Sequence, residues 1–275
     1  MKTRLALLLC VVGVSGYAQS GTFTATANMT TPRMGHTATL LNNGKVLIAG
    51  RIDYTTQSSA ELYDPRTGTF TATGNMTTPR NRHTATLLPD GRVLIAGGAS
   101  AASGEGAFAY GAALASAELY DPQTGTFAAT GKMSTPRIGP IATLLNDGKV
   151  LLASGAYPGA GYCCFPLGAE LYDPDTGMFT ATGDMIASGY ADTATLLPNG
   201  KVLITKGLPQ TGPYLSNAEL YDPSKGTFTF AGYAEANHTG PTATLLMNGK
   251  LLIAGGCLPE ACKGLSYVIL FAIQL

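Results

Sequence analysis

Residues 60–65 read Ala-Glu-Leu-Tyr-Asp-Pro, and the same six residues recur along the chain. The copies begin at Ala60, Ala117, Ala169 and Ala218. A second motif, Gly-Thr-Phe with one Gly-Met-Phe variant, begins at Gly21, Gly68, Gly125, Gly177 and Gly226. A third motif, Ala-Thr-Leu-Leu, begins at Ala38, Ala85, Ala142, Ala194 and Ala243. Three motifs that keep step at a spacing of roughly 50 residues indicate a repeat architecture.

Each repeat predicts four short strands. In the first repeat we expect strands at 37–41 and 45–49, a third around 61–63 and a fourth at 69–73. Asn43-Gly44 separates the first two strands, and matching dipeptides begin at Asp90, Asp147, Asn199 and Asn248. Asn-Gly and Asp-Gly favour a two-residue type I′ hairpin with positive φ at both positions. No segment has a sustained 3.6-residue period, so we expect almost no helix.

A four-stranded sheet of this size needs a neighbour on each face, and radial packing around a channel provides one. The sequence therefore predicts an all-β, five-bladed β-propeller of four-stranded antiparallel blades. The segment 21–26 resembles a lone fourth strand, and the chain ends with candidate strands at 242–247, 250–254 and 267–273. Pairing of the N-terminal strand with the C-terminal blade would close the ring. A truncated or frame-shifted form of a longer six- or seven-bladed protein is the alternative.

The repeats resemble the kelch family. That family places a double glycine before a tyrosine and, after six intervening residues, an aromatic residue. Gly97-Gly98, Tyr120 and Phe127 fit this pattern. The tyrosine and phenylalanine recur as Tyr63 with Phe70, Tyr172 with Phe179 and Tyr221 with Phe228. Two departures are phenylalanine where the family usually has tryptophan, and a double glycine that is intact only in the second and fifth repeats. The run 88–98 is most similar to the bacterial branch that includes the propeller of galactose oxidase.

The first residues predict export. A basic start is followed by an apolar run at 5–14 and by Gly16-Tyr17-Ala18, as in a cleaved signal peptide. We therefore expect a signal peptide at 1–18 and a single propeller domain at 19–275, secreted or periplasmic, without membrane insertion. The formal net charge is zero and no basic run is present, which argues against a nucleic-acid partner.

The cysteines left after cleavage are even in number, as expected in an oxidising compartment. Cys257 and Cys262 flank a short loop, and we expect them to form a disulfide. Cys163 and Cys164 are adjacent. They can form a strained vicinal disulfide, pair elsewhere or remain thiols.

Eight of the seventeen acidic residues belong to the repeated Ala-Glu-Leu-Tyr-Asp-Pro motif, which favours structural roles for them. We expect the aspartates before proline to cap turn amides, and the glutamates of the Ala-Glu-Leu-Tyr motif to pair with Arg33, Arg80 and Arg137. No hydrolase, phosphate-loop or zinc motif is found. The resemblance suggests, as the alternative function, a secreted galactose oxidase-like oxidoreductase or another propeller enzyme. The copper site of that oxidase uses two tyrosines, two histidines and a cysteine bonded to one tyrosine.

The histidines argue against copper. They are His36, His83 and His238, and the first two share one repeat position, which favours a structural role. We therefore predict no cofactor, no metal and no catalytic residue.

The connections between second and third strands vary between repeats, and loops on a rigid scaffold are where binding usually resides. They cover 51–59, 99–116, 156–168, 208–217 and 257–264. In kelch propellers these loops share the channel-mouth face with the connections before the first strands. The candidate ligand-binding residues are Arg82, Arg51, Asp192, His36, His83, Tyr110, Tyr162 and Tyr214.

Arg82 is the first choice, because Thr-Pro-Arg-Asn-Arg-His at 78–83 resembles the segment from which peptide-binding kelch domains project an arginine toward the channel. The alternative is that the aromatic residues simply pack long loops. The sequence thus favours a monomeric, non-catalytic propeller that binds a protein or carbohydrate. A structural or adhesion fragment of a longer polypeptide is a further alternative.

Overall fold

The computed structural model describes residues 24–50, 58–100, 112–156, 166–187, 191–206, 216–234, 242–254 and 268–271. All regular structure in these ranges is β-strand, arranged in five antiparallel sheets with the strands of each sheet in chain order. This confirms the predicted all-β propeller fold of four-stranded sheets. No helix in these ranges is long and apolar enough to cross a membrane.

The strands follow the repeats. The first sheet contains β1 (Thr37–Leu40), β2 (Val46–Ala49), β3 (Ala60–Asp64) and β4 (Thr69–Ala72). The second contains β5 (Thr84–Leu87), β6 (Val93–Ala96), β7 (Ala117–Asp121) and β8 (Thr126–Ala129). The third contains β9 (Ile141–Leu144), β10 (Val150–Ala153), β11 (Gly168–Asp173) and β12 (Met178–Asp184). The fourth contains β13 (Ala191–Leu196), β14 (Val202–Lys206), β15 (Ser216–Asp222) and β16 (Thr227–Ala234). The described part of the fifth contains β17 (Thr242–Leu245), β18 (Leu251–Ala254) and β19 (Val268–Phe271).

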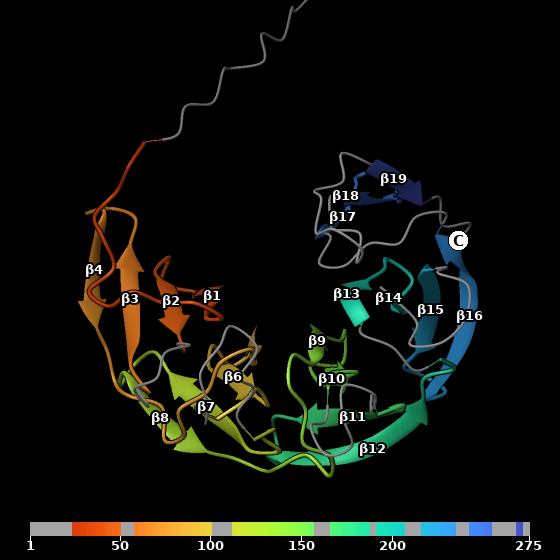
Figure 1. The fold of residues 1–275 in the computed structure, drawn as a ribbon, viewed down its shortest axis with the longest axis horizontal. Helices are drawn as coiled ribbons and strands as arrows, with labels where there is room; N and C mark the ends of the chain where they lie inside the picture. The colour runs from red at the N-terminus through yellow and green to blue at the C-terminus, as the bar shows by residue number, and fades with distance from the viewer. Residues whose placement is uncertain are drawn as a thin grey trace, which may run out of the picture.

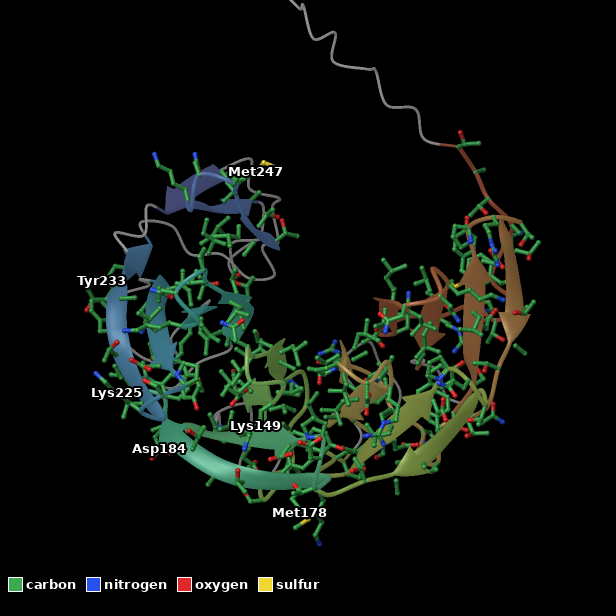
Figure 2. All side chains as sticks on the ribbon, turned by 180° about the vertical axis from the view of Figure 1, so that it is seen from behind. Lys149, Met178, Asp184, Lys225, Tyr233 and Met247 are labelled. Carbon is green, nitrogen blue, oxygen red and sulfur yellow. The ribbon has the colours of Figure 1, made fainter. Side chains whose placement is uncertain are left out.

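The sheets lie one after another along an arc, with the first strand of each sheet on the inner side and the fourth on the outer side (Figure 1). The inner strands β1, β5, β9, β13 and β17 contact one another in sequence order. The outer strands carry exposed side chains such as Met178 and Tyr233 (Figure 2). Each of the three middle sheets therefore presents its two faces to its neighbours, and all five sheets present their inner edges to the centre of the arc.

The turn between the first two strands is not the predicted type I′ hairpin. Gly44 has a φ of 81°, but no other residue of this turn is among the described residues with positive φ. The Leu41 N–H donates to the Lys45 carbonyl at 2.8 Å, and the Gly44 N–H donates to the Leu41 carbonyl at 2.9 Å. This is a three-residue loop, a type I turn closed by a left-handed glycine, and Asn-Gly fits it equally well. The prediction failed because the loop is one residue longer than assumed.

Four apolar clusters join the five sheets. Between the first and second sheets, Leu47 and Met76 pack with Val93, Ile95 and Tyr120, and equivalent residues repeat this contact at the next interfaces. Burying one such aliphatic side chain contributes roughly 1.5–3 kcal/mol. The interfaces, rather than the single sheets, therefore contain the core.

A hydroxyl pair also crosses each of the first three interfaces. Thr73 Oγ1 lies 3.0 Å from the Tyr120 hydroxyl, and the same contact joins Thr130 to Tyr172 and Thr182 to Tyr221. Thr73 and Thr130 lie just beyond a fourth strand and Thr182 lies within the longer β12, and these tyrosines have no exposed surface.

The N-terminal segment occupies the same place against the first sheet. Thr26 Oγ1 lies 3.2 Å from the Tyr63 hydroxyl and donates to the Gly68 carbonyl at 2.9 Å, as Thr73 does to the Gly125 carbonyl. Thr26 thus lies where the end of the fourth strand of a preceding sheet would lie. Residues 21–23 fall outside the described ranges, and no described strand pairs with 24–26. Figure 1 shows the first and last sheets separated, so ring closure stays a prediction.

Candidate functional site

The connections before the first three inner strands are each anchored by a buried arginine. Arg80 donates from Nη2 to Glu118 Oε1 at 2.7 Å, and from Nη1 to the carbonyls of Gly97 and Ser116 at 2.8 and 2.9 Å. The two side chains of the ion pair are 0% and 1% exposed. Burial lowers the pKa of Arg80, while the Glu118 carboxylate acts in the opposite direction. The predicted pairing of glutamate with arginine is confirmed here.

The first and third sheets contain the same pair. Arg33 lies 2.8 Å from Glu61 and Arg137 lies 3.4 Å from Glu170. The glutamates also accept backbone N–H groups of the connection, as Glu61 does from Thr30 at 2.7 Å. Each pair thus ties the connection to the second and third strands of its own sheet.

The fourth sheet holds its buried glutamate with a different cation. Gly189 stands at the arginine position in the sequence, and Lys206 stands where the earlier repeats have Gly50, Gly97 and Ser154. The Lys206 ammonium donates to Glu219 Oε1 and to the Ala187 carbonyl, and its side chain is 2% exposed. Sequence reasoning missed this exchange, because the replacement comes from another strand. The sequence signal was the lysine at the end of the second strand, where the earlier repeats have glycine or serine. It occurs in the fourth repeat, which is the one of these four that lacks the arginine.

In each of the first three connections, the residue two positions after the buried arginine has a left-handed backbone conformation. These residues are here called the left-handed row. It consists of Gly35, Arg82 and Gly139, with φ values of 66°, 50° and 61°. The Arg82 N–H donates to the Gly35 carbonyl at 2.9 Å, and the Gly139 N–H donates to the Arg82 carbonyl at 2.8 Å. One row of backbone hydrogen bonds therefore links the first three sheets just before their inner strands.

Arg82 is the member of this row with a side chain. A left-handed backbone costs roughly 1–2 kcal/mol for a residue with a Cβ and is routine for glycine. Such strain concentrates at functional sites. The Arg82 side chain is half-buried. In the fourth sheet the equivalent residue is Ala191, whose N–H donates instead to Ser154 Oγ at 2.9 Å.

The row lies on the face from which the variable loops leave. The Asn81 N–H donates to the Ala99 carbonyl at 3.1 Å, and the Ala99 N–H donates to the Asn81 carbonyl at 2.9 Å. Residue 99 begins the longest of these loops. Arg82 is thus next to loop residues at the inner edge of the second sheet.

The two histidines that share a repeat position lie in different surroundings. His36 is exposed. His83 is 6% exposed, its Nε2 lies 2.9 Å from Thr37 Oγ1, and its Nδ1 has no hydrogen-bond partner among the described residues. Burial, with smaller effects from the charges of Arg80 and His36, lowers the pKa of His83 to about 3. His83 is therefore a neutral side chain between the first two sheets at ordinary pH.

The remaining sequence-based candidates lie outside what the structure describes. They are Arg51, Tyr110, Tyr162 and Tyr214, together with Cys163, Cys164, Cys257 and Cys262. Asp192 lies in β13, at the repeat position that His36 and His83 occupy in the first two sheets. Within the described ranges, no group of three histidine, cysteine or acidic side chains is arranged to hold a metal ion. Of the candidate ligand-binding residues, Arg82, His36 and His83 are the ones whose side chains the structure describes.

No family model and no curated protein matches the chain. Solved structures are similar to it. The structure of YjhT superposes with a TM-score of 0.68 and 15% identity, over 91% of this chain and 85% of YjhT. A fungal alcohol oxidase of the AA5 family, in complex with copper, superposes with a TM-score of 0.52 and 16% identity, over 83% of this chain and 60% of the oxidase. At these identities the likeness shows the fold alone, a kelch-like β-propeller.

Proposed function

We propose that this chain is a non-catalytic, extracellular binding propeller that recognises a protein or glycan through the face carrying Arg82 and the variable loops. The observation that supports this most is the left-handed Arg82. The row needs a left-handed residue, which glycine supplies without strain at Gly35 and Gly139. The row itself therefore does not require an arginine, and we infer that ligand binding does.

The chemistry of Arg82 indicates which ligand group it contacts. A guanidinium presents a planar fork of N–H donors that matches a carboxylate with two parallel hydrogen bonds. A ligand with an acidic side chain, a chain terminus or an acidic sugar has this group. Arg80 is used within the scaffold, since its guanidinium is buried on Glu118 and on backbone carbonyls.

Arg82→Gly tests the site sharply, because it restores the residue found at the neighbouring positions of the row. Wild-type protein is screened on a glycan array and a peptide array, and its ligands are then measured by calorimetry with each variant. We expect Arg82→Gly to weaken binding by about tenfold or more, the effect of losing a charge-assisted bidentate contact.

Arg66→Ala is the matched control, because it removes the same charge from an exposed turn at the opposite ends of the strands. Equal binding by wild type and Arg82→Gly would overturn the site assignment. Absence of any ligand on both arrays would overturn the binding function.

The second candidate function is that of an oxidase or another propeller enzyme. It is favoured by the similarity to the copper-containing fungal alcohol oxidase. Elemental analysis for copper and a peroxide assay with alcohols test it. Stoichiometric copper with peroxide release would replace the binding proposal, and a metal-free protein without turnover would reject the oxidase.

A further inference from the structure

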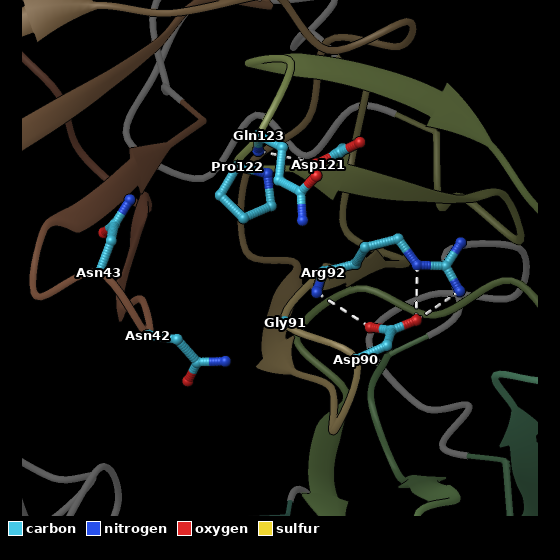
Figure 3. Close-up of a pocket in the computed structure, with 8 residues that line it drawn as sticks. All are labelled: Asn42, Asn43, Asp90, Gly91, Arg92, Asp121, Pro122 and Gln123. Carbon is cyan, nitrogen blue, oxygen red and sulfur yellow. Dashed lines mark hydrogen bonds and ion pairs between the residues drawn. The ribbon is translucent and has the colours of Figure 1, made fainter.

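A polar cleft of ≈ 370 Å³ lies between the first two sheets, at the ends of the strands opposite to Arg82. It is formed by three turns, which join β1 to β2, β5 to β6 and β7 to β8. The polar side chains lining it are Asn42, Asn43, Asp90, Arg92, Asp121 and Gln123. Figure 3 shows the two asparagines on one side of the cleft, facing the turns of the second sheet. The cleft thus combines amide and carboxylate groups in one hollow.

The other sheets show what the repeat does at this place. In three of them, a lysine just after the turn glycine reaches the aspartate of the neighbouring turn in its own sheet. The ammonium-to-carboxylate distances are 3.5 Å for Lys45 to Asp64, 3.0 Å for Lys149 to Asp173 and 3.3 Å for Lys201 to Asp222. Lys149 projects from the third sheet in Figure 2. An ammonium group on this aspartate is therefore the rule of the repeat.

The second sheet departs from that rule because it has Arg92 at the lysine position. The Arg92 guanidinium binds Asp90 of its own turn, with Nε and Nη2 at 2.7 and 2.6 Å from Oδ2 (Figure 3). The third sheet also has an aspartate in its turn, Asp147, yet Lys149 still pairs with Asp173. The different pairing thus follows the arginine, whose fork reaches back onto its own turn.

Asp121 is consequently the aspartate of this set without an ion pair in the described ranges, although the Arg92 guanidinium, held on Asp90, is near enough to attract it electrostatically. One of its oxygens accepts the Gln123 N–H at 2.8 Å, as in an ordinary turn. It lines a cleft together with the Asn42, Asn43 and Gln123 side chains, which both donate and accept hydrogen bonds, and with the Asp90–Arg92 ion pair. Asp121 therefore has the surroundings of an ammonium-binding carboxylate without an ammonium from its own sheet.

We propose that this cleft binds a lysine side chain of a partner peptide, with the ammonium on Asp121 and the peptide groups on the amide side chains. The three ion pairs of the other sheets show that such turns accept an ammonium at 3.0–3.5 Å. This site is independent of the carboxylate-binding function proposed for Arg82, since it lies on the opposite face and prefers the opposite charge.

The test is an NMR titration of isotope-labelled protein with Nα-acetyl-lysine methylamide, compared with Nα-acetyl-norleucine methylamide, which lacks the ammonium. We expect saturable amide shifts at residues 42–43, 90–92, 121 and 123 with the lysine compound alone. Asp121→Asn should weaken the binding by about fivefold, the equivalent of a surface ion pair of ~1 kcal/mol. Arg92→Lys should weaken it similarly, because it gives the second sheet its own ammonium.

Asp147→Asn, in the third-sheet turn that is equivalent to the turn of Asp90, removes one carboxylate outside the cleft; it is the control and should leave the titration unchanged. Equal shifts with the norleucine compound, unchanged affinity in Asp121→Asn, or no saturable shift in wild type would each overturn the proposal. The Arg82→Gly variant should titrate as wild type does, which separates this site from the proposed function.

Discussion

Arg80 and Arg82 are two residues apart, yet they belong to regions that follow the repeat to different degrees. Arg80 lies in a buried ion pair that the first and third sheets also contain, and the fourth sheet keeps its glutamate paired through Lys206. Arg82 lies in a backbone row whose other members are glycines. The difference teaches that buried interactions of the scaffold are preserved or compensated, whereas single departures from the repeat mark candidate binding groups. Arg92 is the second such departure.

The largest effect should come from breaking the buried pair. Arg80→Ala leaves the Glu118 carboxylate, which is 1% exposed, without its cation. Removal of one partner of a buried pair typically costs about 3–5 kcal/mol. We expect a loss of this size in the free energy of unfolding, measured by urea denaturation. Lys206→Ala in the fourth sheet should cause a comparable loss. A loss below about 1 kcal/mol would mean that these pairs do not anchor the scaffold.

The dependence of the unfolding free energy on pH should distinguish His83 from His36, the two histidines that share a repeat position. The pKa of His83 is lowered to about 3, so between that pH and about 6.5 the unfolded chain binds a proton that the folded chain excludes. Stability therefore falls as pH decreases through this window, by up to ~1.4 kcal/mol per pH unit from this group. His83→Gln should flatten the dependence of the unfolding free energy on pH.

The matched substitution is His36→Gln, on the exposed side chain. Unfolding free energies measured between about pH 4 and 6 provide the comparison. A larger change of slope in His36→Gln than in His83→Gln would contradict the interpretation of His83 as an excluded base.

A smaller effect tests the predicted closure of the ring. Leu40 on the first sheet is 63% exposed, whereas its equivalents Leu87, Leu144 and Leu196 pack against a preceding sheet. If the last sheet covers the first, Leu40→Ala should destabilise the protein by about 1–2 kcal/mol, as expected for Leu87→Ala. A loss within about 0.5 kcal/mol for Leu40→Ala alone would show that this face is exposed to solvent.

The fold and much of the scaffold could be predicted because they depend on local, repeated signals. The aspartates before proline cap turn amides as expected: Asp64 accepts the Arg66 N–H at 2.9 Å and Asp121 accepts the Gln123 N–H at 2.8 Å. The glutamate–arginine pairs of the first three sheets also agree, because those three repeats bring the same two groups to the same places. The hairpin type did not agree, since the dipeptide fits loops of two lengths.

The site could be predicted only in part, because its decisive features depend on contacts between sheets. Arg82 was a candidate from its resemblance to a family segment, but its left-handed φ is set by hydrogen bonds to Gly35 and Gly139 of neighbouring sheets. Lys206 and the cleft at Asp121 were missed for the same reason. Each becomes visible when equivalent residues of several sheets are compared in space.

The most direct test of whether Arg82 is separate from the scaffold is the free energy of unfolding of Arg82→Gly relative to wild type. Relief of the left-handed strain should raise it by about 1 kcal/mol, since glycine adopts this φ of 50° freely. A decrease approaching that of Arg80→Ala would contradict this and place Arg82 among the structural residues.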